Sequence, residues 1–222
     1  KEREYRMKRS FLYLLLAIVL SLTLTACQAS QSDKPEERSA KETTEPAAQE
    51  KIFKSSDELF QLTADDTWKN AAKTLDIEDA SIAIGKNDQA YITLISEYRY
   101  NFADGLSGYH EMVVKNMQDH IDEDKTGEEE ELRLGDHDAF KTEITGKVDG
   151  EESTYVIYCV EIEDYYVQVI CWSGTDDQEK FAAEFDKIAR SLMSRSEAQE
   201  NSEESGNTSD ESSESSWDRT EE

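Results

Sequence analysis

The chain has 222 residues with 51 acidic and 24 basic side chains, and its formal net charge is −27. Residues 51–195 alone carry 33 acids and 15 bases, a net charge of −18. Phosphate recognition needs clustered Lys and Arg, which this composition does not supply, so it argues against nucleic-acid binding. The acidic excess also repels anionic lipid, so direct adsorption of this region to a membrane surface is not expected.

The N-terminal segment Met7–Cys27 has the order of features found in a secretory signal. Lys8 and Arg9 precede an apolar run from Phe11 to about Leu22, which is short for a spanning helix of about 20 apolar residues. The run ends in small and polar residues. Residues Lys1–Arg6 lie upstream of the natural-looking start at Met7 and do not enter the fold argument.

The tetrapeptide Leu24-Thr25-Ala26-Cys27 resembles the lipobox of bacterial lipoproteins. This resemblance implies cleavage before Cys27, lipidation of its thiol and attachment to the extracytoplasmic face of a cell membrane. An ordinary signal anchor with an incidental cysteine is the alternative. Gln28–Glu50 shows no apolar periodicity and is expected to be a disordered tether. As a flexible chain it spans roughly 25–30 Å.

The region 51–195 is predicted to be one α+β domain, and its first elements are short. Leu59–Leu62 predicts a strand, and Trp68–Leu75 predicts a helical turn in which Trp68 is a core anchor, with ligand stacking as the alternative. Ser81–Gly85 and Ala90–Ile95 flank a polar turn and predict a hairpin. A helix is then expected over 104–121, because its apolar residues recur at three- and four-residue steps: Leu106, Tyr109, Val113, Met117 and Ile121.

The stretch Thr154–Trp172 predicts the central hairpin of the sheet. Its two apolar runs are rich in β-branched and aromatic residues on both alternating faces, which is typical of strands inside a layered structure. A turn centred near Glu163 pairs Cys159 with about Gln168, and Cys171 with about Val156. The two thiols are then around 10 Å apart at about 3.3 Å per residue, too far for a disulfide.

The remaining elements surround this hairpin. Leu132–Leu134 and Ala139–Val148 predict further strands after a solvated loop at Glu128–Glu131. A terminal helix is expected over 176–193, with Thr175 and Gln178 forming a capping box. Residues 196–222 contain ten acids and one Arg, cannot bury enough apolar surface and are expected to be disordered. Trp217 is the one candidate docking residue in this tail.

The predicted fold is an antiparallel sheet of six or seven strands flanked by helices. The order of its pieces resembles the PsbP-like superfamily, which includes DcrB-type bacterial lipoproteins and the photosystem II extrinsic subunit. The matching pieces are Leu59–Leu62, Trp68, Tyr91–Tyr100, the helix through Tyr109 and Met117, Gly135–Ala139, the central hairpin and the Phe181–Leu192 helix. The resemblance implies an α/β/α sandwich and an accessory or assembly role, and it carries over no catalytic residue.

Each sequence motif that could indicate catalysis or metal binding is incomplete. His110-Glu111 begins like a zinc-binding HExxH sequence, but Val114 stands where the second histidine belongs. Ser107 lies in a partial nucleophile elbow whose closing glycine is replaced by Tyr109. Asp122, Asp124, Thr126 and Gly127 fit the first positions of a calcium loop, but Arg133 occupies the place of the bidentate glutamate. We therefore assign no catalytic residue, metal site or cofactor.

The sequence thus predicts a lipid-anchored, non-catalytic extracytoplasmic domain that binds a protein partner in cell-envelope assembly or transport. An exported domain without a disulfide suits a Gram-positive surface. Two alternatives remain open. One is an envelope-acting hydrolase, for which Ser107 and the carboxylates are the candidates, and the other is a cation-responsive module that uses the acidic segment 119–131.

We expect Cys27→Ala to release the protein into the medium or to leave it uncleaved, because two acyl chains on this thiol supply the two signals that stable anchoring needs. Labelling of cells with radioactive palmitate and fractionation of membranes measure both effects. Wild-type protein that takes up no palmitate contradicts the anchor.

Overall fold

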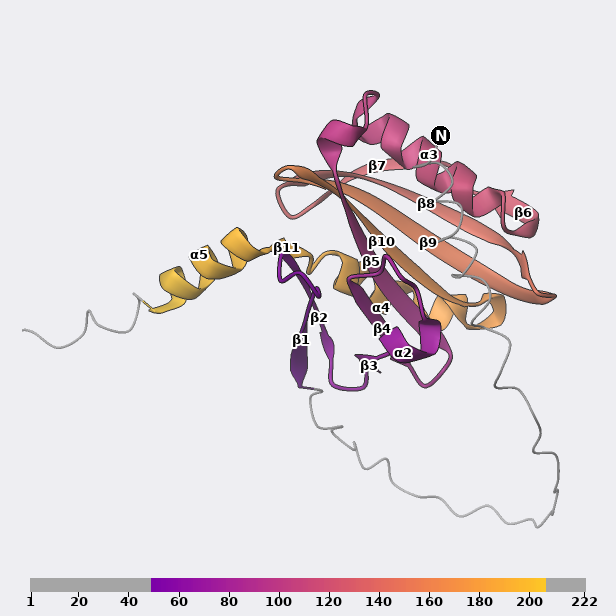
Figure 1. Cartoon of the computed structure of the whole chain (residues 1–222). Helices are drawn as coiled ribbons and strands as arrows, with labels where there is room; N and C mark the ends of the chain where they lie inside the picture. Colours follow the sequence, from indigo (N-terminus) through magenta and orange to yellow (C-terminus); the bar gives the residue numbers. More distant parts are fainter. Residues whose placement is uncertain (1–48, 207–222) are drawn as a thin grey trace, which may run out of the picture.

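The computed structural model describes residues 49–206, and these fold around a large antiparallel sheet (Figure 1). The strand order is β3-β4-β5-β10-β9-β8-β6, and β7 also pairs with β8. A smaller sheet has the order β1-β2-β11. The strands are β1 (Glu50–Lys54), β2 (Phe60–Asp65), β3 (Lys69–Asn70), β4 (Ile82–Lys86), β5 (Ala90–Tyr98), β6 (Asp122–Thr126), β7 (Glu130–Leu134), β8 (His137–Val148), β9 (Glu151–Ile162), β10 (Tyr165–Gly174) and β11 (Met193–Ser194).

Helices cover both faces of the large sheet. Figure 1 shows α3 on one face, while α4 and the small sheet lie on the other. The α-helices are α2 (Ala72–Leu75), α3 (Gly105–Gln118), α4 (Gln178–Ala189) and α5 (Arg195–Gly206), and the 3-10 turns are η1 (Arg99–Asn101) and η2 (Thr175–Asp177). Among residues 49–206, none of the helices is long and apolar enough to cross a membrane. The predicted α+β class, an antiparallel sheet flanked by helices, is confirmed.

The central hairpin is confirmed together with its register. Strands β9 and β10 pair so that Cys159 lies opposite Gln168 and Cys171 lies opposite Val156. Both thiols are free and buried, and burial raises the pKa of each. They therefore behave as small apolar side chains rather than as a disulfide.

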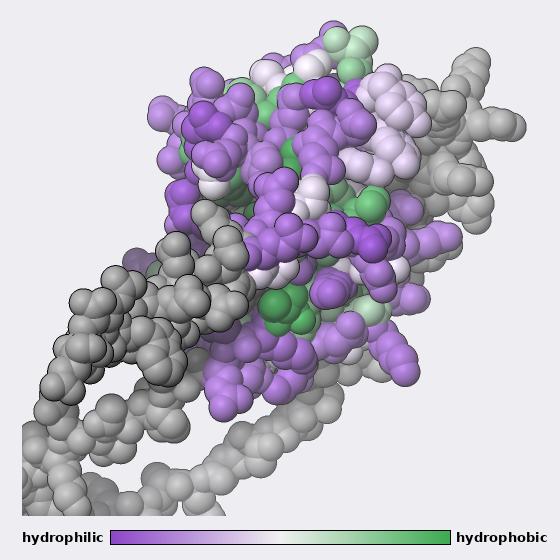
Figure 2. Space-filling view, turned by 90° about the vertical axis from the view of Figure 1, so that its left-hand side faces the viewer, coloured by the Kyte–Doolittle hydropathy of each residue, from purple (hydrophilic) through white to green (hydrophobic). Residues whose placement is uncertain are grey.

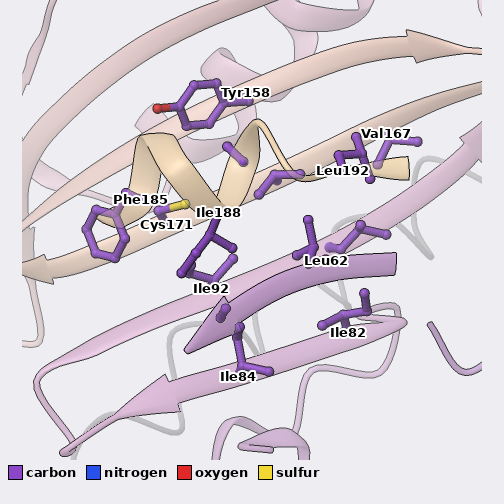
Figure 3. Packing of buried hydrophobic residues seen from close by; sticks show 14 of the residues in the cluster. Leu62, Ile82, Ile84, Ile92, Tyr158, Val167, Cys171, Phe185, Ile188 and Leu192 are labelled. Atoms are coloured by element: carbon purple, nitrogen blue, oxygen red, sulfur yellow. The ribbon is translucent and has the colours of Figure 1, made fainter. Parts of the chain in front are cut away.

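Two hydrophobic cores form because both faces of this hairpin are apolar. Alternate residues of β9 and β10 pack under α4 and the small sheet, among them Tyr158, Val167 and Cys171, as Figure 3 shows. Phe185 and Ile188 of α4 meet Leu62 of β2 and Ile92 of β5 in that core (Figure 3). The other set packs under α3, with Tyr155, Ile157, Cys159, Tyr166, Ile170 and Trp172 against Leu106, Tyr109, Val113 and Met117. The apolar stripe predicted for α3 is thus confirmed.

Several predicted boundaries were wrong, most of them where strands are short or exposed. The large sheet has eight strands rather than six or seven. Two strands that were not predicted join it, the two-residue β3 and the acidic edge strand β6 with every side chain exposed, while the predicted strand Leu59–Leu62 corresponds to β2 of the small sheet. Glu130 and Glu131 belong to β7 rather than to a loop. The predicted turn from Trp68 is helical only over Ala72–Leu75, although Trp68 is fully buried as expected.

The C-terminal part also differs from prediction. Helix α4 ends at Ala189, and the capping box expected from Thr175 and Gln178 is absent. A reciprocal capping box forms instead at α5: Ser194 N–H donates to Glu197 at 2.7 Å, and Glu197 N–H donates to Ser194 Oγ at 3.3 Å. Residues 196–206, expected to be disordered, therefore lie in a helix. The signal, most of the tether and Trp217 lie outside the described residues.

Gly146 of β8 marks a close approach between strands. A Cβ atom placed there would lie 2.9 Å from Asp122 O and would collide with the Ile121 side chain. The register between β6 and β8 shifts at this point, between Asp122 and Lys125. The close pairing of β6 with β8 thus depends on a residue without a side chain.

We expect Gly146→Ala to lower the free energy of unfolding by about 1–3 kcal/mol, the usual cost of overpacking a filled site. Gly174→Ala is the matched control, because a Cβ there meets nothing within 4 Å and its φ of −56° suits alanine. Urea denaturation of both variants measures the difference. Equal stability of the two would show that β6 does not approach β8 as described.

Candidate functional site

The residues singled out by sequence for catalysis or metal binding do not come together. Ser107 is exposed in the first turn of α3, and His110, on the same helix, is buried with Nδ1 2.8 Å from Glu129 Oε2. His137 Nε2 instead lies 2.6 Å from Glu197 Oε1. Among residues 49–206 no group of three or more His, Cys, Asp or Glu is placed to hold a metal. Cys27 lies outside the described residues.

The acidic segment 119–131 is not a loop around a cation. Its centre is strand β6, whose backbone pairs with β8, and Glu123 forms an ion pair with Lys147 at 2.6 Å. This salt bridge lies on the surface, where such pairs contribute little to stability. Glu123 has a φ of 54° at the irregularity where the register between β6 and β8 shifts. Because no group of three or more His, Cys, Asp or Glu within residues 49–206 is placed to hold a metal, this segment lacks the converging ligands of a calcium loop.

A different group of residues forms an aromatic surface where β5 ends and β10 begins. Tyr98, Tyr100 and Tyr165 stack in one row, which we call the tyrosine platform. The ring centroids of Tyr100 and Tyr98 are 5.2 Å apart, and those of Tyr98 and Tyr165 are 4.6 Å apart. Tyr165 meets the buried ring of Phe60 edge-on at 5.4 Å. The row therefore runs from the hydrophobic core out to solvent.

The outer two rings of the platform are exposed to solvent. Tyr98 is 45% exposed and Tyr100 is 76% exposed, and with Ile52 they are the exposed large hydrophobic side chains of the described region. A hydrogen bond with Tyr98, reinforced by partial burial, raises the pKa of Tyr165 to about 12. The three rings present aromatic faces and hydroxyl groups to a ligand.

Arg99 holds the platform in place. Its guanidinium lies 2.6 Å from Glu161 Oε1 and 3.8 Å from Asp164 Oδ1, and its backbone N–H donates to Asp164 O at 3.0 Å. These contacts fix η1 against the turn between β9 and β10. Because Arg99 lies between Tyr98 and Tyr100 in the chain, these contacts also hold the backbone that carries the two exposed rings.

The surroundings of the platform are mainly acidic. Asp57 and Asp164 both act electrostatically on the Tyr165 hydroxyl, and Glu163 accepts a hydrogen bond from Ser196 at the start of α5. The Asp164 side chain is 81% exposed. Figure 2 shows that the face from which α5 projects is mostly hydrophilic, with only small and separate hydrophobic areas. A ligand at this end therefore meets aromatic rings set among charges rather than an apolar patch.

A polar cluster lies at the same strand ends but on the α3 side. Tyr109 OH donates to Glu97 Oε2 at 2.8 Å, and Gln168 Nε2 donates to Tyr109 OH at 2.7 Å and to Glu97 Oε2 at 3.3 Å. The edges of this cluster are aromatic, since Phe102 and Tyr166 pack on the Tyr109 ring at 4.6 and 4.9 Å. Gln168 Oε1 is buried without a partner in the described structure.

Burial sets the protonation behaviour of this cluster. Burial raises the pKa of Glu97 even though the hydrogen bonds from Tyr109 and Gln168 act to lower it. Burial and the neighbouring Glu97 carboxylate together raise the pKa of Tyr109 well above its ordinary value. A half-buried carboxylate held by two donors is a means of fixing α3 to the sheet.

The sequence analysis did not single out the platform or the polar cluster. A signal for both was present in Glu97-Tyr98-Arg99-Tyr100, where aromatic and charged residues alternate at the end of a strand. Strand alternation puts Glu97 and Tyr98 on opposite faces of β5, and Tyr100 follows in η1, where its ring stacks on Tyr98. The partner residue Tyr165 follows the hairpin turn, and its position opposite Tyr98 depends on the pairing of β5 with β10.

No protein-family model matches the sequence, and the search of curated proteins found no match. Solved structures with a similar fold include the cyanobacterial PsbP protein of Synechocystis sp. PCC 6803, with 9% identity over 70% of this chain and 98% of that chain, at a TM-score of 0.48. The Ran-binding protein Mog1p of Saccharomyces cerevisiae shows 9% identity over 67% of this chain and 97% of that chain, also at 0.48.

LpqN of Mycobacterium tuberculosis, described as involved in cell envelope biogenesis, shows 12% identity over 67% of this chain and 92% of that chain, at a TM-score of 0.48. At these identities the similarities say nothing about a shared ligand or partner.

We expect Glu97→Gln to raise stability at neutral pH. The pKa of Glu97 is higher in the folded state than in the unfolded chain. The free energy of unfolding of the wild type therefore falls as the pH rises from the pKa of the unfolded state through that of the folded state. The glutamine side chain still offers an oxygen that accepts the hydrogen bond from Tyr109 OH, and because it is uncharged it removes the cost of burying a carboxylate. The gain in melting temperature is therefore larger at pH 7 than at pH 4.

The matched control is Glu111→Gln, which changes an exposed glutamate on α3. It should shift the melting temperature little at either pH. A loss of stability at pH 7 in Glu97→Gln alone would show that the charge of Glu97 is required and that its hydrogen bonds outweigh its burial.

Proposed function

We propose that the chain is a lipid-anchored, non-catalytic binding protein on the extracytoplasmic face of the cell membrane, where it engages a protein partner in envelope assembly or transport. The single observation that supports this best is the tyrosine platform: stacked aromatic rings, two of them exposed, where β5 ends and β10 begins. The anchor is inferred from the lipobox-like Leu24–Cys27.

The platform has the composition of an interface centre. Tyrosine is enriched at the energetically important centres of protein interfaces, because it adds contact area with few rotatable bonds and carries a polar tip. The contacts of Arg99 already hold η1, and the three rings stack on one another, so binding has less side-chain freedom to remove. A specific interface buries about 800 Å² on each partner, so the platform is the centre of a larger contact.

The tether limits where this partner is found. Gln28–Glu50 is expected to span roughly 25–30 Å as a flexible chain, enough to clear the lipid headgroups. Held this close, the domain meets membrane-associated partners at a high effective concentration. Weak contacts through the platform therefore suffice for association at the membrane.

A catalytic role finds less support. The thiols of Cys159 and Cys171 are buried with raised pKa values, which makes both poor nucleophiles. Ser107 is exposed, while His110 on the same helix is buried with its Nδ1 directed to Glu129. The carboxylates of 119–131 are spread along β6, the segment that follows it and the start of β7, which gives the cation-responsive alternative less support.

A photo-crosslinking amino acid at position 100 should capture a protein partner in intact cells. The same amino acid at position 111 on α3 is the matched control, because Glu111 is exposed and outside the platform. We expect a discrete crosslinked species from position 100 only, and its loss when Cys27→Ala detaches the protein from the membrane. Equal crosslinking from both positions, or none from position 100, contradicts the proposal.

A further inference from the structure

We propose that the tyrosine platform recognises an arginine side chain presented by an extended segment of the partner protein. This inference rests on the proposed function and names the chemistry of its contact. The guanidinium would stack on the exposed face of Tyr100 or Tyr98 and would donate hydrogen bonds to the carboxylate of Asp164. Aromatic faces attract cations through the ring quadrupole, most effectively beside a negative charge.

The position of Asp164 supports this assignment. Its side chain is 81% exposed, and its nearest basic contact, Arg99, is 3.8 Å away. Arg99 makes its short contact with Glu161 instead, at 2.6 Å. Glu163 accepts from Ser196, and Asp57 accepts from Ser55 Oγ at 2.5 Å and from Leu59 N–H at 3.1 Å. Asp164 is thus the carboxylate beside the platform that is left most open to a further cation.

The charge of the chain favours the same class of partner. Residues 51–195 carry a net charge of −18, which attracts basic segments over long range and repels acidic ones. Arginine suits the platform better than lysine does, because its planar group stacks on aromatic rings and pairs with a carboxylate through two N–H groups at once. A neutral sugar would also stack on the rings and could donate hydroxyl hydrogen bonds to Asp164, but it would gain no attraction from the net charge.

The test measures binding of fluorescent peptides to the full chain in nonionic detergent at low ionic strength. The probes are repeating Arg-Gly, Lys-Gly and Glu-Gly peptides of equal length, followed by fluorescence polarisation. We expect the Arg-Gly peptide to bind more tightly than the Lys-Gly peptide, and the Glu-Gly peptide not to bind. Higher salt should weaken both cationic peptides, because screening acts on their common charge.

Variants separate the platform from diffuse charge attraction. Tyr100→Ala should weaken Arg-Gly binding about two- to fivefold, the value of one exposed cation–π contact. Tyr100→Phe keeps the aromatic face and should bind nearly as wild type does. Asp164→Asn should remove most of the preference for arginine over lysine. Glu111→Gln removes the same charge from α3 and should leave that preference unchanged.

Equal binding of the Arg-Gly and Lys-Gly peptides, or equal losses in Asp164→Asn and Glu111→Gln, would overturn the inference in favour of nonspecific attraction. Absence of peptide binding overturns it as well. If position 100 crosslinks to a partner but the peptides give any of these results, the proposed function stands and only the assignment of arginine as the ligand is rejected. Binding of neutral oligosaccharide that Tyr100→Ala abolishes, without arginine binding, would assign the platform to a sugar.

Discussion

The pairing of β9 with β10 is the constraint on which the rest of this structure depends. Both strands are apolar on both faces, so neither face can be left in water, and each must be covered by another layer. Helix α4 and the small sheet cover one face, and α3 covers the other (Figure 1). Residues far apart in sequence thereby share one core, as Leu62 of β2 and Phe185 of α4 do (Figure 3).

The same pairing places the candidate site. Tyr165 lies opposite Tyr98, while the next pair, Tyr166 and Glu97, faces α3. Since successive side chains alternate between faces, a slip of one residue would bury the tyrosine row under α3 and move Glu97 to the opposite side. The platform and the polar cluster therefore share one origin, and the large apolar surface of the hairpin fixes both.

Exposure explains which elements could be predicted and which could not. Buried periodic segments such as α3 and the central hairpin, and with them the separation of Cys159 from Cys171, follow from the order of apolar residues alone. Strand β6 could not be found in this way, because all its side chains are exposed and none of them is apolar. The helix that begins at Arg195 escaped notice for a related reason: its acidic composition suggested disorder, whereas Ser194 and Glu197 cap its first turn.

The sequence by itself determined the fold class, the two-faced central hairpin with its register and the expectation of an anchor at Cys27. Each depends on neighbours in the chain, where apolar periodicity and motif spacing are visible. Only the tertiary structure decided that Tyr98, Tyr100 and Tyr165 form one row, that Arg99 fixes it, and that Asp164 lies beside it. These contacts join strands separated by more than sixty residues, and their positions follow from packing that no local pattern records.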